Sequence, residues 1–276
     1  MLNEFYKTNI VLNSGYEMPT IGLGTWTLYG KIAENAVYNA LKCGYRLIDT
    51  AKNYENEVAV GRGIKRAINE GFVTRKEIFV TTKISPTEIN EYDAMIYECN
   101  ERLGLDYIDL MLVHNKSDND LKLYKAIERA INNKKVLSWG ISNYYTIEDF
   151  DRIIENTKIL PAIIQNENHP YFQNSNLQQY AGTKETIIES YYPLGGMEHT
   201  KDLLNSEIIN KIAKKYGKTC AQVILKWHIQ SKYIVIPGTS DLKHIKENID
   251  IFDFELNNYD MKEISDMNTN IRYENW

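Results

Sequence analysis

Short apolar runs alternate with longer stretches of helical spacing along most of the chain. In residues 31–43, Ala33, Val37 and Leu41 share one helical face, Gly44 then provides a helix stop, and the apolar run 46–48 follows. The same helix-and-strand unit recurs as far as the C-terminal region. The pattern predicts strands at 46–48, 78–82, 107–113, 135–141, 162–164, 185–188 and 233–236, and helices at 31–43, 56–70, 92–103, 119–132, 146–156, 175–181 and 203–230, with a last helix from Asp241.

The N-terminal residues carry strand patterns with no helix between them. Runs 9–12 and 16–18 flank a turn that contains Gly15, which predicts a small β-hairpin, and a short strand follows at 20–23. About eight strands then alternate with helices, an arrangement that predicts an α/β fold with a parallel sheet. We therefore expect a (β/α)8 TIM barrel with an N-terminal β-hairpin, formed as a single domain by residues 1–276.

A doubly wound open sheet is the alternative fold. Such a sheet binds dinucleotides through a glycine-rich turn after its first strand. Segment 22–26 (GLGTW) contains Gly22 and Gly24 but no third glycine at the required offset, so the dinucleotide fingerprint is absent. The closed barrel is therefore the favoured fold.

Composition narrows the classes of function. The chain has 276 residues, 43% of them hydrophobic, which is enough for one large core, and its net charge of -5 argues against nucleic-acid or anionic-membrane partners. Cys43, Cys99 and Cys220 stand far apart, which argues against a disulfide framework and a zinc site. Neither a signal-peptide core nor an apolar run of roughly 18 residues occurs, so we expect a soluble cytoplasmic protein.

Polar residues follow three of the apolar runs at the point where each run ends. Asp49 follows 46–48, Lys83 follows 78–82 and His114 follows 107–113, while Tyr54 lies in the loop after Asp49. In a parallel barrel the carboxyl ends of the strands meet at one mouth, where the chemistry of such folds is found. An ammonium beside a phenol lowers the pKa of the phenol, and a neutral imidazole can orient a carbonyl oxygen. These side chains therefore suit proton transfer to a carbonyl oxygen.

Structural and metal-binding interpretations of the same residues stay open at this point. Asp49 and Lys83 can form a purely structural ion pair with Tyr54 as a partly buried aromatic, and a lone histidine such as His114 is more often a core residue. A metal-dependent lyase or isomerase is a further alternative. It would use His114, Asp49, Asp109 and Glu57 as ligands, but neither an H-x-H nor an H-E-x-x-H spacing occurs, so we expect no metal.

The chain resembles the aldo-keto reductases over nearly its full length. The similarity rests on motifs that occur in order and at suitable separations. They are 22–26 (GLGTW), 49–57 (DTAKNYENE), 82–83 (TK), 102–114 (RLGLDYIDLMLVH), 139–143 (WGISN), Gln165, 169–171 (HPY), 192–195 (YPLG) and 234–237 (IVIP). Asp49, Tyr54, Lys83 and His114 fall on the catalytic positions of that family.

The resemblance implies an NAD(P)H-dependent reductase of small aldehydes and ketones. The barrel would bind a nicotinamide cofactor without a Rossmann domain, and hydride would pass from the reduced nicotinamide to a carbonyl carbon. Tyr54 would protonate the oxygen, with Lys83 and Asp49 tuning its acidity and His114 orienting the substrate. The partner would be a small carbonyl compound. We expect a monomer, with an oligomer as the alternative.

The resemblance also implies the residues that contact cofactor and substrate. Ser142, Asn143 and Gln165 would hold the carboxamide of the nicotinamide, and Tyr191 would stack on its ring, roles that suit their donors, acceptors and aromatic face. Further cofactor contacts are expected from Gly24, Thr25, Trp26, Pro193, Leu194, Gly195, Ile236, Gly238, Thr239, Ser240, His244, Glu247 and Asn248. Substrate contacts are expected from Trp26, Tyr54, His114 and Asn115.

Two positions depart from the family in the region expected to bind the extra phosphate of NADPH. Many members carry a lysine and an arginine where this chain has Gly238 and His244. Loss of two fixed charges weakens phosphate discrimination, because a histidine is mostly neutral at pH 7. NADPH is the expected cofactor, with NADH or dual use as the alternative.

The expected substrate site also departs from the family. Asn115 and Lys116 stand where a tryptophan and a proline often follow the catalytic histidine, which replaces an apolar wall by a polar one. A short loop at 195–200 suggests an open site with broad acceptance of aldehydes and ketones, and Trp276 is a candidate to reach it. A cofactor-binding regulatory or scaffold protein on the same barrel is the alternative function; the presence of all four catalytic residues favours the enzyme.

Overall fold

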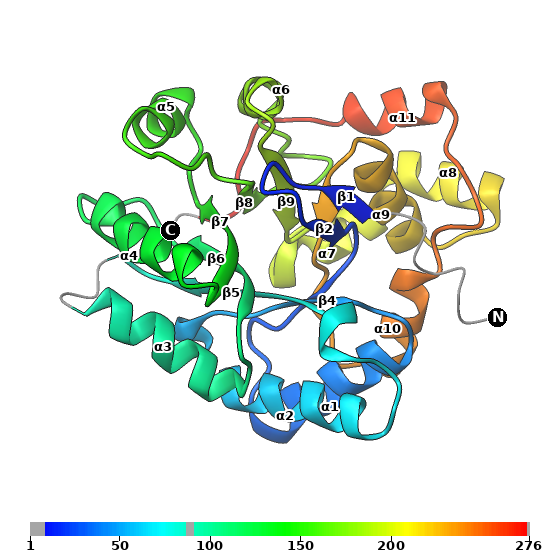
Figure 1. Ribbon diagram of the computed structural model, residues 1–276. Coiled ribbons are helices and arrows are strands. Elements are labelled where there is room, and N and C mark those ends of the chain that lie inside the picture. Colours follow the sequence, from blue (N-terminus) through cyan, green and yellow to red (C-terminus); the bar gives the residue numbers. More distant parts are fainter. Residues whose placement is uncertain (1–8, 87–90, 275–276) are drawn as a thin grey trace.

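A ring of parallel strands forms the centre of the computed structural model, which describes residues 9–86 and 91–274 (Figure 1). The strands lie in the order β10-β9-β8-β7-β6-β5-β4-β3. Bridges from Ile21 to Val235 and from Gly24 to Gly238 join the two ends, so the predicted (β/α)8 barrel is confirmed. The strands are β3 Leu23–Gly24, β4 Leu47–Asp49, β5 Phe79–Ile84, β6 Ile108–Val113, β7 Val136–Ser142, β8 Ile163–Glu167, β9 Ile187–Tyr191 and β10 Ile234–Val235.

Helices surround this ring on the outside (Figure 1). They connect successive parallel strands, as a barrel of this kind requires. The α-helices are α1 Gly30–Lys42, α2 Glu57–Asn69, α3 Tyr92–Leu103, α4 Asp120–Asn132, α5 Ile147–Glu155, α6 Ser175–Thr183, α7 Gly196–Leu204, α8 Glu207–Tyr216, α9 Cys220–Gln230, α10 Leu242–Ile249 and α11 Asn258–Ser265. Two 3-10 turns, η1 Lys52–Tyr54 and η2 Arg75–Glu77, precede α2 and β5.

The C-terminal third contains more helices than the pattern predicted. The single helical region predicted at 203–230 is divided among α7, α8 and α9, because Gly217 takes a φ of +64° after α8 and Thr219 begins α9 with a capping box. The prediction of a loop at 195–200 is also wrong, since α7 begins at Gly196. Helix α10 is not the last helix either, because α11 follows it.

The predicted N-terminal hairpin is confirmed, and it closes one end of the barrel. Strands β1 Asn9–Val11 and β2 Glu17–Pro19 pair antiparallel, and the hairpin crosses the ring in Figure 1. Its side chains Leu12 and Met18 are buried in one cluster with Leu47, Phe79 and Leu110. These strand residues lie toward the amino ends, so the hairpin excludes water from the end opposite the predicted site.

Strand pleating divides the interior of the barrel into an apolar and a polar half. Successive side chains of a strand point to opposite faces, so residues two apart share a face. On β4, Leu47 belongs to the interior cluster and Asp49 continues the same face toward the carboxyl end. On β9, Ile187 packs on that cluster and Glu189 continues its face. The polar residues therefore gather at one mouth.

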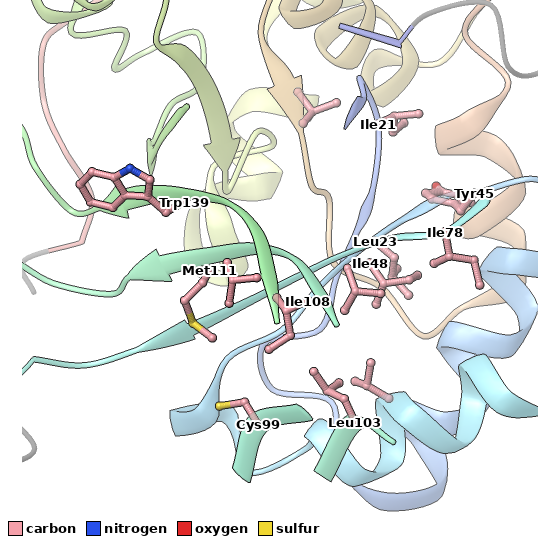
Figure 2. Close-up of a cluster of buried hydrophobic side chains, with 14 of the residues drawn as sticks. Ile21, Leu23, Tyr45, Ile48, Ile78, Cys99, Leu103, Ile108, Met111 and Trp139 are labelled. Carbon is pink, nitrogen blue, oxygen red and sulfur yellow. The ribbon is translucent and has the colours of Figure 1, made fainter. Parts of the chain in front are cut away.

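The alternate strand residues point outward and form a second core beneath the helices. Ile48 and Met111 share this core with Cys99 and Leu103 of α3 (Figure 2). Burial of this layer is the main contribution to stability, because it removes apolar area from water around the whole ring.

Within the described part of the chain, no helix is both long and apolar enough to cross a membrane.

Close approach of α2 and α3 predicts a stability effect at Gly61. A Cβ atom added there would lie 2.7 Å from the carbonyl carbon of Leu103, so we expect Gly61→Ala to lower the free energy of unfolding by about 2 kcal/mol or more. The matched control is Gly182→Ala in α6, where an added Cβ meets no atom within 4 Å. That variant should be neutral or more stable by about 0.5 kcal/mol, since alanine favours helix. Chemical denaturation measures both, and equal effects would contradict the packing argument.

Candidate active site

A buried ion pair lies at the mouth of the barrel. The Lys83 ammonium donates to Asp49 Oδ1 at 2.6 Å, to the carbonyl of Thr50 at 2.9 Å and to the phenol oxygen of Tyr54 at 3.1 Å. Asp49 and Lys83 are 2% and 0% exposed. Neighbouring strands β4 and β5 carry the two charges, and the 3-10 turn η1 brings Tyr54 back over them. The structure thus brings together the residues expected from the sequence.

Burial and the charge of Lys83 act in opposite directions on the acidity of Tyr54. Burial alone would lower the pKa of Lys83, but the neighbouring Asp49 and Tyr54 raise it, which keeps the ammonium charged. Burial raises the pKa of Tyr54 above its ordinary value. The charge of Lys83 lowers this pKa, but by less than burial raises it. The net direction is the reverse of the lowering expected from the sequence, because desolvation disfavours the phenolate more than the ammonium favours it. The phenol therefore carries its proton at neutral pH.

His114 follows β6, the strand beyond β5, and faces Tyr54 from there. Its backbone N–H donates to the carbonyl of Ile84 at 2.9 Å, and its ring lies edge-on to the phenol with centroids 5.7 Å apart. Burial, and then the charge of Lys83, lower the pKa of His114 to about 3, so the imidazole is neutral, as expected. Its Nδ1 is buried and has no hydrogen-bond partner among residues 9–86 and 91–274.

Two cavities meet at Tyr54. The larger cavity, of about 470 Å³, runs from the barrel mouth toward α10, and the smaller, of about 230 Å³, lies over β6, β7 and β8. Both are lined by Trp26, Tyr54, Tyr191 and Tyr192. The phenol that Lys83 contacts is therefore accessible from either side.

Most of the cofactor and substrate residues expected from the sequence line these cavities. The larger cavity is lined by Gly24, Trp26, Tyr191, Pro193, Leu194, Ile236, Gly238, Thr239, Ser240, His244, Glu247 and Asn248. The smaller is lined by Trp26, Tyr54, His114, Asn115, Ser142, Asn143, Gln165 and Tyr191. Two expected residues do not reach a cavity surface: Thr25 is buried with its hydroxyl bonded to the carbonyl of Asp49, and Gly195 forms the turn into α7. Trp276 lies outside the described residues.

The structure also shows lining residues that the sequence analysis missed. Helix α7 contributes Met197, Thr200 and Leu204 to the larger cavity, and Asn53 lines the smaller one. The spacing of three and four residues among the α7 side chains is helical, and this signal could have identified them. Glu189, fully buried on β9, was also missed, although it directly follows the predicted strand 185–188, the placement that identified Asp49, Lys83 and His114.

A hydrogen-bond network holds Asn143 at the wall of the smaller cavity. Asn143 has a φ of +64°, which turns the chain sharply after β7. Its side-chain nitrogen donates to the carbonyl of His114 and to Asn115 Oδ1, both at 3.0 Å. Its Oδ1 accepts from the hydroxyls of Tyr191 at 2.9 Å and Tyr145 at 3.3 Å. The position of His114 is thereby tied to Tyr191 across the cavity.

Asn56 holds the loop that carries Trp26. Its side-chain nitrogen donates to the carbonyls of Thr25 at 2.8 Å and Leu28 at 2.9 Å, and its Oδ1 accepts from the Thr50 hydroxyl at 2.6 Å. Asn56 is 1% exposed, so water does not compete with these bonds. The indole lies 4.8 Å from the Tyr54 ring, centroid to centroid, as part of this fixed loop.

The residues considered as metal ligands are separated in the structure. Asp109 pairs with Arg75, and Glu57 pairs with Arg102, each at 2.7 Å. Within the chain as described, no three histidine, cysteine or acidic side chains are grouped in a way that would hold a metal ion.

Comparison with known proteins places these features in one family. The model of the Aldo/keto reductase family matches residues 20–269. An NADP-dependent D-sorbitol-6-phosphate dehydrogenase from Malus domestica is 34% identical, with 92% of each chain covered, and an NAD(P)H-dependent D-xylose reductase from Candida tropicalis is 35% identical, with 96% of this chain and 93% of that protein covered.

Solved structures agree with the sequence relatives. The crystal structure of an aldo-keto reductase from a Medee basin deep-sea metagenome library is 40% identical and superposes with a TM-score of 0.91 over 97% of each chain. The aldose reductase of Schistosoma japonicum is 31% identical, with a TM-score of 0.88 over 97% of this chain and 94% of that chain. Because the family match and these relatives extend over almost the whole barrel, the chain belongs to the Aldo/keto reductase family.

Proposed function

We propose that this protein is an NAD(P)H-dependent reductase that converts small aldehydes and ketones to alcohols, with Tyr54 as the proton donor. The observation that carries the proposal is the 3.1 Å contact between the Lys83 ammonium and the Tyr54 phenol at the junction of two cavities. The relatives support it, since those named above include an NAD(P)H-dependent reductase of a sugar aldehyde and an NADP-dependent dehydrogenase.

The residues of the larger cavity fit a nicotinamide dinucleotide. Thr239 and Ser240 precede the N-terminus of α10, where backbone amides and the helix dipole suit a phosphate. At the other end Tyr191, which lines both cavities, offers an aromatic face, and Ser142 and Gln165 line the smaller cavity beside it. A reduced nicotinamide bound between these ends supplies the hydride. Asn143 would line the carboxamide site, where His114, Asn115, Tyr145 and Tyr191 hold its side chain.

The residues around Tyr54 would manage the proton. A carbonyl oxygen in the smaller cavity would accept hydrogen bonds from the Tyr54 hydroxyl and from His114, which orients it. As negative charge develops on that oxygen, the phenol transfers its proton, and Lys83 stabilises the resulting phenolate. Asp49 keeps the ammonium in place at 2.6 Å. In the direction of alcohol oxidation the same phenolate would take the proton back.

Charge in the larger cavity suggests a relaxed choice between NADPH and NADH. Its acidic lining residues are Asp49 and Glu247, and among the described lining residues there is neither lysine nor arginine. Gly238 and His244 line this cavity at the positions where the family often has those cations. We propose NADPH as the cofactor, with NADH as a competent second one.

The smaller cavity suggests compact, polar carbonyl substrates. Its lining includes two asparagines, Asn53 and Asn115, as well as aromatic residues such as Trp26 and Tyr192. The volume of about 230 Å³ would be shared with the carboxamide of the nicotinamide, which Ser142, Asn143 and Gln165 would hold, so the remaining space suits a short aldehyde or ketone better than a multi-ring compound.

The cellular setting is part of the same proposal. All three cysteines are free, which suits the reducing cytoplasm. The continuous ring from β3 to β10 supports one domain over residues 1–276. We propose a monomer, since Asp49, Lys83 and Tyr54 come together within one barrel and the site needs no residue from a second copy.

Removal of the Tyr54 hydroxyl tests the proton donor. Tyr54→Phe should lower kcat for carbonyl reduction by about 1000-fold or more, because a positioned general acid is lost, while the affinity for NADPH changes little. Absorbance of the reduced nicotinamide follows turnover, and quenching of protein fluorescence follows binding. Tyr29→Phe is the matched control, since Tyr29 is 54% exposed and lines neither cavity. Full activity of Tyr54→Phe would refute the assigned role.

The pH dependence tests the state of His114. With a pKa lowered to about 3, the imidazole gains a proton only far below neutrality, so kcat/KM should show no acidic inflection from His114 between pH 5 and 7. His114→Gln should reduce kcat/KM by about tenfold without changing the shape of the profile in this range. An inflection near pH 6.5 that disappears in His114→Gln would show that the imidazole titrates there and contradict a neutral role.

A restored cation tests the basis of cofactor preference. His244→Arg should raise the affinity for NADPH relative to NADH by about tenfold, because a guanidinium binds phosphate through charge-assisted hydrogen bonds. Leu242→Arg is the control, since it adds the same charge to the same helix at a residue that does not line the larger cavity. Fluorescence titration with both cofactors measures the ratio. An equal change of the NADPH-to-NADH affinity ratio in the two variants would mean that nonspecific electrostatic attraction, and not a cation at position 244, decides the preference.

A further inference from the structure

Gln165 is held from behind by two carboxyl groups. Its side-chain nitrogen donates to Asp49 Oδ2 and to Glu189 Oε2, both at 2.8 Å. Gln165 and Glu189 are register partners on β8 and β9, so strand pairing sets their separation. Both N–H groups of the amide are therefore occupied inside the barrel. The carbonyl oxygen of Gln165 is left for the smaller cavity, which this residue lines.

Glu189 is an unusual residue for the place it occupies. It is 0% exposed, and its Oε1 has no hydrogen-bond partner among residues 9–86 and 91–274. An apolar side chain would fill the site without the cost of burying a carboxyl group. The presence of a carboxyl group here therefore points to a function for the second oxygen, Oε2. This oxygen accepts the hydrogen bond from Gln165.

The charges around Glu189 make its carboxyl group a neutral acceptor. The ionisable groups that face it are Asp49 on β4, Lys83 on β5 and Tyr54, and Gln165 bonds both Glu189 and Asp49. Burial, and then the charge of Asp49, raise the pKa of Glu189 to about 8, so the group is largely protonated at pH 7, and because Oε2 accepts from Gln165 the proton belongs on Oε1. A protonated carboxyl and a glutamine amide have nearly the same shape, and each offers one carbonyl oxygen.

We propose that Glu189 is a positioning residue that fixes the amide of Gln165 with its nitrogen inward and its carbonyl oxygen toward the cofactor. In that orientation Gln165 can only accept a hydrogen bond from the cofactor. It therefore selects a ligand that offers an N–H donor, and the carboxamide of a nicotinamide is such a ligand. Asp49 contributes to the same orientation, which links the cofactor contact to the ion pair at Lys83. The inference rests on the proposed function and adds a residue that touches neither cofactor nor substrate.

A pair of cofactor analogues isolates this effect. The probes are NADP+ and its 3-acetylpyridine analogue, in which a methyl group replaces the amide NH2, or the NAD+ pair if the parent protein binds that form more tightly. Binding is measured by fluorescence titration, so the readout does not depend on turnover. The parent should prefer the nicotinamide form, because only that form donates to Gln165.

Two substitutions at Glu189 test the positioning role. Glu189→Met removes the acceptor at similar size and should reduce the preference for the nicotinamide form by about fivefold, the effect of one hydrogen bond. Glu189→Gln should restore the parental preference, because its amide can turn its carbonyl oxygen toward Gln165. A side chain that only fills space would be replaced equally well by methionine.

Each outcome decides between the proposals. Parental preference in Glu189→Met, or loss of preference in Glu189→Gln as well, would overturn the positioning role while the proposed function stands. A parent protein that binds neither probe would overturn both. If Glu189→Met does not fold, Gln165→Met takes its place: loss of preference supports an accepting Gln165, and retained preference overturns the inference.

Discussion

The contact between Lys83 and Asp49 is the interaction on which the rest of this structure depends. An ammonium and a carboxylate are costly to bury unless they pair and their other polar atoms find partners. Neighbouring strands bring the two charges to 2.6 Å, and Thr50 and Gln165 bond to the remaining atoms. Those four residues come from β4, β5, β8 and the loop after β4, so only a closed ring can assemble them.

The ring and the gathering of Asp49, Lys83 and His114 at one mouth could be predicted because they depend on local pattern. Alternation of short apolar runs with helical stretches identifies the strands, and a polar residue directly after such a run lies at a carboxyl end. Asp49, Lys83 and His114 follow this rule. The boundaries in 203–230 could not be separated in this way, since apolar spacing continues through Gly217, where the backbone turns to a positive φ.

Other features depend on distances between strands and were beyond the sequence. The sequence suggests that Lys83 makes Tyr54 more acidic, but burial has the larger effect and raises the pKa of the phenol. Glu189 was missed because its meaning comes from register: it lies opposite Gln165 only when β8 and β9 pair as they do here. Propensity and motif identify single residues. The hydrogen bond between Gln165 and Glu189 joins residues 24 apart in the sequence, so it becomes apparent only in the folded sheet.

The two ends of the barrel share strands but not side chains. The hairpin residues Leu12 and Met18 seal one end against apolar residues such as Leu47, while the loops at the other end carry Trp26 and Asn115. Changes in those loops leave the sealed end in place. In evolutionary terms, this separation allows the range of substrates to drift by substitution and insertion around the mouth, while selection for a folded chain acts on a different set of residues.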